Sequence, residues 1–263
     1  MENFGYSAAT LAKLERVAQI LPWVVKMSAA HVRRFGGHFW YVEANAGPGR
    51  YEVEGRVVDG SPVIGLMALR HLDVPYRAVL VEQDEQRCAS LEAALKARDL
   101  FDPRRVVIQC ADNRAALPLI CQFAGGRRDR GLVFFDPKGA PDWGLMDTVT
   151  GLRATECVDV LVNVPTLTLK LERRAAQSAR FGGKGYKWDT KDVRPLSERL
   201  PMLHKRRYLI GAPHGQWAWS LILGSNWPGF PEWKAGGMDA GDGPVGEARL
   251  RDLSLSRDER GAA

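Results

Sequence analysis

The chain has 263 residues, of which 45% are hydrophobic and 26% charged, and its formal net charge is +6. This composition is ordinary for a globular protein with one large domain or two small ones. No apolar run approaches the roughly 18 residues that a membrane-spanning helix needs, and the N-terminal residues lack the basic-then-apolar layout of a signal peptide. We therefore expect a cytoplasmic protein, and neither a membrane protein, a secreted disulfide scaffold nor a disordered chain.

Cysteines and basic residues add two expectations. The four cysteines are too far apart for a Cys-x-x-Cys pair, and the five histidines form no metal-binding pattern. Buried free thiols in a reducing compartment and no metal site are therefore expected. Within residues 170–207, 12 Lys and Arg oppose four Asp and Glu, so the basic character belongs to this one segment.

Apolar spacing predicts the elements in chain order. An amphipathic helix is expected over 7–34, which Pro22 should kink or split. Short apolar runs and helical segments then alternate. Strands are expected at 39–44, 78–81, 106–110, 132–135 and 158–162, and helices at 62–72, 84–97, 113–123 and 142–152. This alternation predicts a doubly wound, mostly parallel sheet covered on both faces, as in Rossmann-like α/β proteins.

The pattern changes after residue 165. A basic helix is expected over 165–181, and the segment 182–188 that follows is rich in glycine. The apolar runs 207–211 and 216–223 are joined by Ala212-Pro213-His214-Gly215 and predict a hairpin. The sheet would then hold five parallel strands and a final antiparallel pair, seven strands in all.

The clearest ligand-binding pattern is Glu43-Ala44-Asn45-Ala46-Gly47-Pro48-Gly49, directly after the first strand. Ligands of open α/β sheets bind at the carboxyl ends of the strands, where glycines let them approach the backbone. A dinucleotide fingerprint would need glycine at the position of Glu52 and an immediate helix, whereas the next helix is expected at Ser61. S-adenosylmethionine, which has no phosphate, therefore fits better than NAD or FAD.

Two later strand ends carry acidic residues. Glu82 ends the second strand, where its carboxylate can accept hydrogen bonds from both ribose hydroxyls. Asp112-Asn113 follows the third strand, where the pair can bind adenine. Each acid has a structural alternative, which is to cap the helix that follows.

The fourth strand ends in Phe135-Asp136-Pro137-Lys138-Gly139, followed by Trp143. Methylation of an exocyclic amine needs groups that accept the amine hydrogens, so that the nitrogen lone pair faces the methyl group. Asp136 and the Pro137 carbonyl can do this, while Trp143 or Phe135 stacks on a base. In the alternative interpretation, Asp-Pro only ends the strand and caps a helix.

These motifs resemble those of the three-Cys-motif partner proteins, which are similar to class I S-adenosylmethionine-dependent methyltransferases. The matching residues are Glu43 to Tyr51, Asp59-Gly60-Ser61-Pro62, Glu82, Asp112 and Asp136-Pro137, and the resemblance covers roughly residues 38–165. It implies a seven-stranded sheet whose last strand is antiparallel. It also implies that the methionine end of the cofactor contacts Glu43, Asn45, Gly47 and Gly49, the ribose contacts Glu82, and the adenine contacts Asp112. Ala46, Gln83 and Asn113 are expected to be further cofactor-binding residues.

The acceptor is less well defined. Lys138-Gly139 stands where methyltransferases of the Asp-Pro-Pro-Tyr type have proline and an aromatic residue. The basic segment interleaves cations with aromatic residues, a composition typical of single-strand binding, although a solvated helix face is the alternative. The residues expected to bind the acceptor are Lys138, Trp143, Lys184, Tyr186, Lys187 and Trp188.

The sequence thus predicts an S-adenosylmethionine-dependent methyltransferase that acts on a nucleic acid, most simply on a base amine. We expect an N-terminal helical extension (1–37), a catalytic domain (38–224) and a C-terminal tail (225–263). Two alternatives stay open: a non-catalytic module that binds a protein partner, and a methyltransferase for a small molecule or protein.

Overall fold

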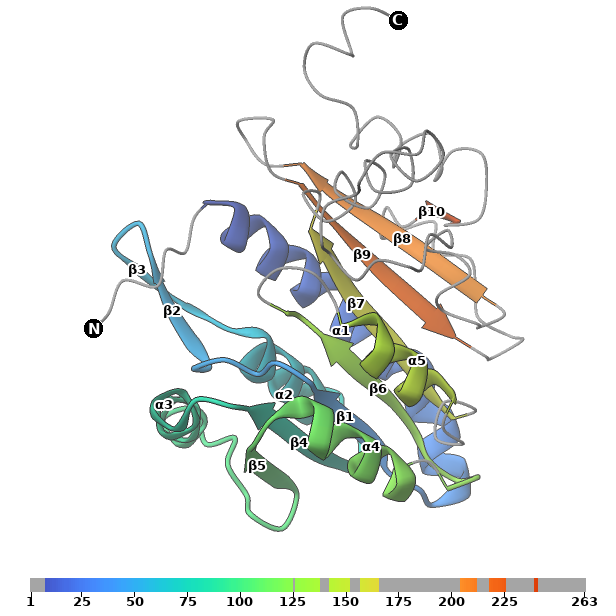
Figure 1. Ribbon diagram of the computed structural model, residues 1–263. Coiled ribbons are helices and arrows are strands. Elements are labelled where there is room, and N and C mark those ends of the chain that lie inside the picture. Colours follow the sequence, from blue (N-terminus) through green and yellow to red (C-terminus); the bar gives the residue numbers. More distant parts are fainter. Residues whose placement is uncertain are drawn as a thin grey trace, which may run out of the picture.

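The computed structural model describes residues 8–124, 126–137, 142–151, 157–165, 204–211, 218–225 and 239–240. The predicted basic helix over 165–181, the glycine-rich segment after it and most of the predicted tail lie outside these residues. The helices are α1 (Ala8–Phe35), α2 (Ser61–His71), α3 (Glu85–Lys96), α4 (Asn113–Phe123) and α5 (Trp143–Gly151). The strands are β1 (Phe39–Glu43), β2 (Arg50–Val53), β3 (Arg56–Asp59), β4 (Tyr76–Glu82), β5 (Val106–Cys110), β6 (Arg130–Phe135), β7 (Val158–Pro165), β8 (His204–Gly211), β9 (Ala218–Ser225) and β10 (Asp239–Ala240) (Figure 1).

One mixed sheet organises the fold, in the order β10-β8-β9-β7-β6-β1-β4-β5. The five strands from β7 to β5 in that order are parallel, while β9 runs antiparallel to both β7 and β8. The mostly parallel sheet is confirmed, and β8 pairs with β9 as predicted, although the connection at 212–217 lies outside the described residues. The predicted count of seven strands omits the two-residue β10.

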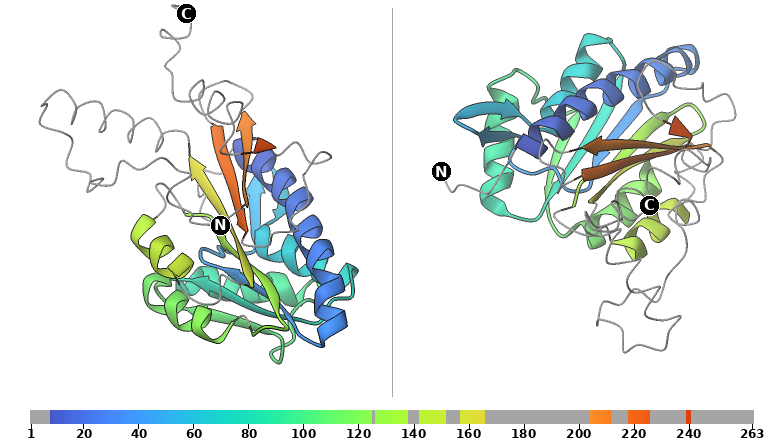
Figure 2. Two further views of the ribbon diagram at one scale, coloured as in Figure 1. Left: turned by 90° about the vertical axis from the view of Figure 1, so that its right-hand side faces the viewer. Right: turned by 90° about the horizontal axis from the view of Figure 1, so that it is seen from above.

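Helices cover both faces of the sheet (Figure 2). Side chains of α1, α2 and α3 share one core with alternate residues of the strands, such as Phe39 and Tyr41 on β1. Side chains of α4 and α5 share the other core, which takes Val42 from the same strand. Because successive side chains of a strand point to opposite faces, β1, β4, β6 and β7 contribute to both cores and appear in the sequence as apolar runs. The edge strand β5 contributes to the first core alone.

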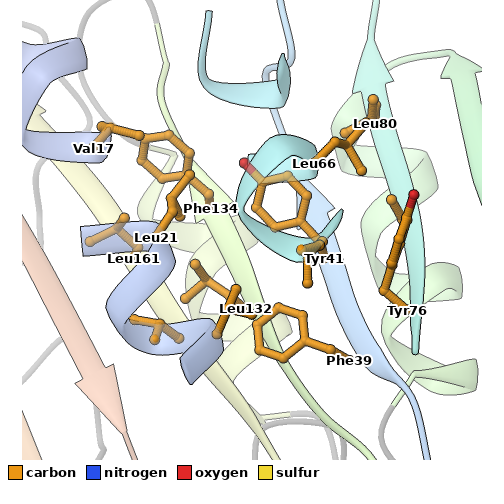
Figure 3. Close-up of a cluster of buried hydrophobic side chains, with 14 of the residues drawn as sticks. Val17, Leu21, Phe39, Tyr41, Leu66, Tyr76, Leu80, Leu132, Phe134 and Leu161 are labelled. Atoms are coloured by element: carbon orange, nitrogen blue, oxygen red, sulfur yellow. The ribbon is translucent and has the colours of Figure 1, made fainter. Parts of the chain in front are cut away.

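The N-terminal helix α1 is part of the first core. It continues through Pro22 as one helix and does not split. Val17 and Leu21 lie beside Phe134 and Leu161 of the sheet (Figure 3), and α1 packs chiefly on α2 and β6. The segment predicted as an extension therefore includes a helix that covers the sheet.

A small hairpin, β2 and β3, follows the first strand and was not predicted. It pairs Arg50 with Asp59 and Val53 with Arg56, apart from the main sheet. Its turn is Glu54-Gly55, with both φ angles positive at 51° and 74°. Two-residue hairpin turns usually place Asn-Gly or Asp-Gly here, so Glu-Gly is a weak signal in the sequence.

Gly65 allows α2 to approach β1 closely. A Cβ atom at this position would lie 2.4 Å from Cζ of the Tyr41 ring. We expect Gly65→Ala to lower the free energy of unfolding by about 1–3 kcal/mol, because overpacking outweighs the better helix propensity of alanine. The control is Gly144→Ala in α5, where the nearest atom would be 3.5 Å from the new Cβ. Urea titration that finds Gly65→Ala as stable as the control would contradict this packing.

None of the helices described here is both long enough and apolar enough to cross a bilayer.

Candidate functional site

A cleft of about 410 Å³ lies at the carboxyl ends of the central parallel strands. Six residues that the sequence analysis singled out line it, at or after the ends of β1, β4, β5 and β6: Asn45, Gln83, Asp112, Asn113, Phe135 and Pro137. Arg114, Asp142 and Leu145 complete the lining. The strand order reverses beside β1, and open α/β sheets bind their ligands in the crevice beyond such a reversal.

The loop after β1 is held in place by backbone hydrogen bonds. The amide of Ala46 donates to the carbonyl of Val81 at 2.8 Å, and the amide of Gly60 donates to the carbonyl of Gly49 at 2.8 Å. Gly47 and Gly49 have φ angles of +65° and +76°, which favour glycine. The predicted importance of these two glycines therefore has a structural reason within the loop itself, whichever ligand the cleft binds.

Glu82 links this loop to β4. Its Oε2 accepts a hydrogen bond from the amide of Gly47 at 2.8 Å, and its Oε1 accepts from the amides of Gln83 and Asp84 at 3.0 Å each. The side chain is only 8% exposed. Each carboxylate oxygen has more than one lone-pair site, so bonds to the backbone still allow a bond to a ligand hydroxyl.

The lip of the cleft is formed by the N-terminal ends of α4 and α5. Asp112 caps α4 by accepting a hydrogen bond from the amide of Arg114 at 2.9 Å, which is the structural alternative considered for it. Arg114 also donates from Nε to Oδ2 of Asp142 at 2.6 Å. Burial alone would raise the pKa of Asp142, but hydrogen bonds from the Leu145 amide and Arg114 outweigh it and lower that pKa. Asp142 is therefore a carboxylate at neutral pH.

Glu43 is buried and does not line the cleft. It is 1% exposed, and its carboxyl group accepts hydrogen bonds from the hydroxyls of Tyr41 and Ser61. Burial raises the pKa of Glu43 to about 8, even though both hydrogen bonds act to lower it. The role of Glu43 at the methionine end of a cofactor therefore stays a prediction.

The raised pKa of Glu43 predicts a pH-dependent stability. Between pH 4.5 and about 8 the folded chain holds a proton that the unfolded chain releases, so stability falls as pH rises through this window. A neutral amide at this position abolishes the effect. We expect the free energy of unfolding of the wild type to decline, relative to Glu43→Gln, by several kcal/mol across the window. Parallel pH profiles in urea titrations would show that Glu43 is already ionised when folded.

Asp136 follows β6 and is held by two partners. Its Oδ2 accepts a hydrogen bond from Nζ of Lys13 on α1 at 2.6 Å, and its Oδ1 accepts from Nδ2 of Asn163 on β7 at 2.7 Å. The side chains of Lys13 and Asp136 are 15% and 13% exposed. Oδ1 of Asn163 is buried and has no hydrogen-bond donor among the described residues. The site thus combines an ion pair with an unused acceptor oxygen.

Other predicted acceptor-binding residues are not described in the same detail. Trp143 is the first residue of α5, and its side chain is not described. Four residues of the basic segment and the residue after Pro137 lie outside the described residues: Lys184, Tyr186, Lys187, Trp188 and Lys138.

The sequence prediction missed Lys13. It precedes Val17 by four residues and so lies on the stripe of α1 that faces the core. Lysine is seldom buried unless paired, so a lysine on the buried stripe of an amphipathic helix was a usable signal for a buried acidic partner. Arg114 and Ser61 gave no comparable signal, because both types are common at helix starts or on surfaces.

No cluster of three or more His, Cys, Asp or Glu side chains that could hold a metal ion occurs among the described residues.

The fold and the cleft define an α/β protein with a cleft at the carboxyl ends of its parallel strands. No protein-family model and no curated protein matches the sequence. The structure is similar to that of a protein from Legionella pneumophila, with a TM-score of 0.54 and 13% identity over 95% of this chain and 92% of that one. At this identity the similarity shows a shared fold.

Methyltransferases occur among the weaker structural similarities. One is a methyltransferase from Geobacter sulfurreducens, with a TM-score of 0.43 and 12% identity over 79% of this chain and 76% of that one. Another, from Streptococcus pneumoniae, is described as a candidate tRNA (m1A22) methyltransferase, with a TM-score of 0.45 and 12% identity over 95% and 83%. Scores this low carry no argument about activity.

Proposed function

We propose that the chain is an S-adenosylmethionine-dependent methyltransferase, related to the three-Cys-motif partner proteins that its motifs resemble. The observation that carries this proposal is the cleft over the ends of β1, β4 and β5, lined by Asn45, Gln83 and Asp112. Glu82 does not line the cleft but directly precedes Gln83 and accepts from the Gly47 amide. These groups offer acceptors for ribose hydroxyls and for an adenine amine. When bound, the cofactor would supply an electrophilic methyl group, so no protein nucleophile is needed.

The connection after β1 favours this cofactor over a dinucleotide. A dinucleotide site places its pyrophosphate on the N-terminus of a helix that begins directly after the first strand. Here the hairpin β2–β3 stands between Gly49 and α2, and α2 begins only at Ser61. The amide of Gly47 is moreover bonded to Glu82.

For the acceptor we propose a nucleic acid, with a base amine as the methylated group. Asp136 and the Pro137 carbonyl would accept the hydrogens of the amine, and Asn163 would hold Asp136 in place through its Nδ2 donor. Pro137 lines the cleft and directly follows Asp136. Acceptor groups for N–H hydrogens suit a neutral amine better than a phosphate or a carboxylate, since those carry no such hydrogen at neutral pH.

The test is transfer of labelled methyl groups from S-adenosylmethionine to RNA and to DNA oligonucleotides, followed by analysis of the modified nucleosides. We expect a methylated base amine, and a transfer rate that falls steeply between low and physiological salt because phosphate contacts release counterions. Methylation of ribose or of protein instead would overturn the proposal of a base amine as acceptor but would still support S-adenosylmethionine as the cofactor.

The alternative is a non-catalytic module that binds a protein partner. One observation favours it: both oxygens of Asp136 already have partners, Lys13 and Asn163, within the chain. This alternative predicts that no acceptor class is methylated even where the cofactor binds.

A further inference from the structure

Two cysteines meet beside Glu82. Cys110 is the last residue of β5 and is the register partner of Glu82 on β4. Cys88, in the first turn of α3, donates a hydrogen bond from Sγ to the carbonyl oxygen of Glu82 at 3.3 Å. The same oxygen accepts from the amide of Ala111 at 3.0 Å. The position of Cys88 on α3 and the register of Cys110 on β5 thus place both cysteines next to Glu82.

The two thiols differ in access to solvent. Cys88 is 8% exposed, whereas Cys110 is exposed, so the expectation that all four cysteines are buried is wrong for Cys110. Burial, and after it the neighbouring Cys110 thiol, raises the pKa of Cys88 to about 12. Cys121, by contrast, is on α4 and is buried in the second core, which α4 and α5 form with the sheet.

We propose that Cys88 and Cys110 form a peroxide-sensitive thiol pair that closes to a disulfide. This proposal does not depend on the methyltransferase function, because it uses only the thiols and a hydroperoxide.

The chemistry has two steps. In the first, the exposed Cys110 sulfur attacks one oxygen of the hydroperoxide, the O–O bond breaks, and Cys110 sulfenic acid forms with release of the alcohol or of water. In the second, the Cys88 sulfur attacks the Cys110 sulfur, the S–O bond breaks, and the hydroxyl leaves as water with the Cys88 proton. The two thiols lose two electrons, and the peroxide gains them.

Access and contact set the order of the steps. The oxidant reaches the exposed Cys110 first. Cys88 stays protonated at neutral pH and is shielded from solvent, so it reacts poorly with free peroxide. Because both cysteines adjoin Glu82, the second step is intramolecular, which compensates for the small thiolate fraction of Cys88.

Closure of the disulfide also removes the S–H donor of Cys88 from the Glu82 carbonyl. The oxidised pair would covalently join the start of α3 to the end of β5 next to Glu82, whose carboxylate accepts a hydrogen bond from the Gly47 amide.

The experiment treats the full-length chain with hydrogen peroxide, blocks the remaining thiols by alkylation and maps the cysteines by peptide mass spectrometry. We expect a Cys88–Cys110 linked peptide that dithiothreitol reverses, with Cys121 still a thiol. In Cys88→Ser we expect a dimedone adduct on Cys110, and in Cys110→Ser the loss of at least 90% of Cys88 oxidation. Oxidation of Cys110 to sulfinic acid without a linked peptide in the wild type would overturn the proposal, as would equal oxidation of Cys88 in Cys110→Ser.

Discussion

Glu82→Ala is expected to weaken the binding of S-adenosylmethionine by about 10- to 100-fold, because charge-assisted hydrogen bonds contribute about 1.5–3 kcal/mol each. Part of this loss has an indirect cause. The substitution also removes the acceptor of the amides of Gly47, Gln83 and Asp84, so the loop after β1 loses its link to β4. Isothermal titration calorimetry measures the affinity, and hydrogen exchange at the Gly47 amide reports the order of the loop.

Glu82→Gln separates the two causes. It keeps one carbonyl oxygen for backbone amides but replaces the other with a donor, which cannot accept from a hydroxyl. The matched control is Glu85→Ala, which removes the same charge from the exposed first turn of α3. Equal affinities for the wild type and both Glu82 variants would mean that the ribose does not lie at this carboxylate.

Asp136→Asn is expected to slow methyl transfer by about 10²- to 10⁴-fold, the range for loss of a group that positions or accepts a proton, while the affinity for the cofactor changes little. Lys13→Met is expected to lower the rate as well, because it leaves the carboxylate of Asp136 without the cation that orients it. Rates of methyl transfer to the acceptor identified above measure both effects. Lys13→Arg, which keeps the cation, should retain most of the rate that Lys13→Met loses.

The ion pair between Lys13 and Asp136 can also be tested through protein stability, without a methyl acceptor. Lys13→Met should reduce the free energy of unfolding by about 1–3 kcal/mol, since it strands a largely buried carboxylate. The double variant with Asp136→Asn should be more stable than the sum of the single changes implies. Lys26→Met, on an exposed position of the same helix, is the control. Additive changes in such a cycle would show that Lys13 and Asp136 do not interact in solution.

The sheet could be predicted because its signal is local. Four of the five parallel strands are buried on both faces and appear as short apolar runs. Ser61-Pro62 and Asp112-Asn113 mark helix starts where the structure has them. The hairpin β2–β3 was missed because each strand has only four residues and its Glu-Gly turn is uncommon. Strand β10 has two residues, which is too short for an alternating apolar pattern to be recognised.

The candidate site was predictable only in part. Residues at strand ends could be assigned to one edge of the sheet, and Asn45, Gln83, Asp112, Asn113 and Pro137 do line one cleft there. What the sequence does not show is which partner a side chain selects. Glu43 points to Tyr41 and Ser61 in the core, and Asp136 pairs with Lys13, which is 123 residues away along the chain. Such contacts depend on how α1 and α2 pack on the sheet, and no local pattern encodes that.

The most direct test of the central claim is calorimetric titration of S-adenosylmethionine into the wild-type chain, with NAD as the control ligand. The structure has a cleft with acceptor groups at the strand ends and no helix starting directly after Gly49. We therefore predict saturable binding of S-adenosylmethionine at one site, competition by S-adenosylhomocysteine and no heat of binding with NAD. No binding of S-adenosylmethionine, whether or not NAD binds, would contradict the account.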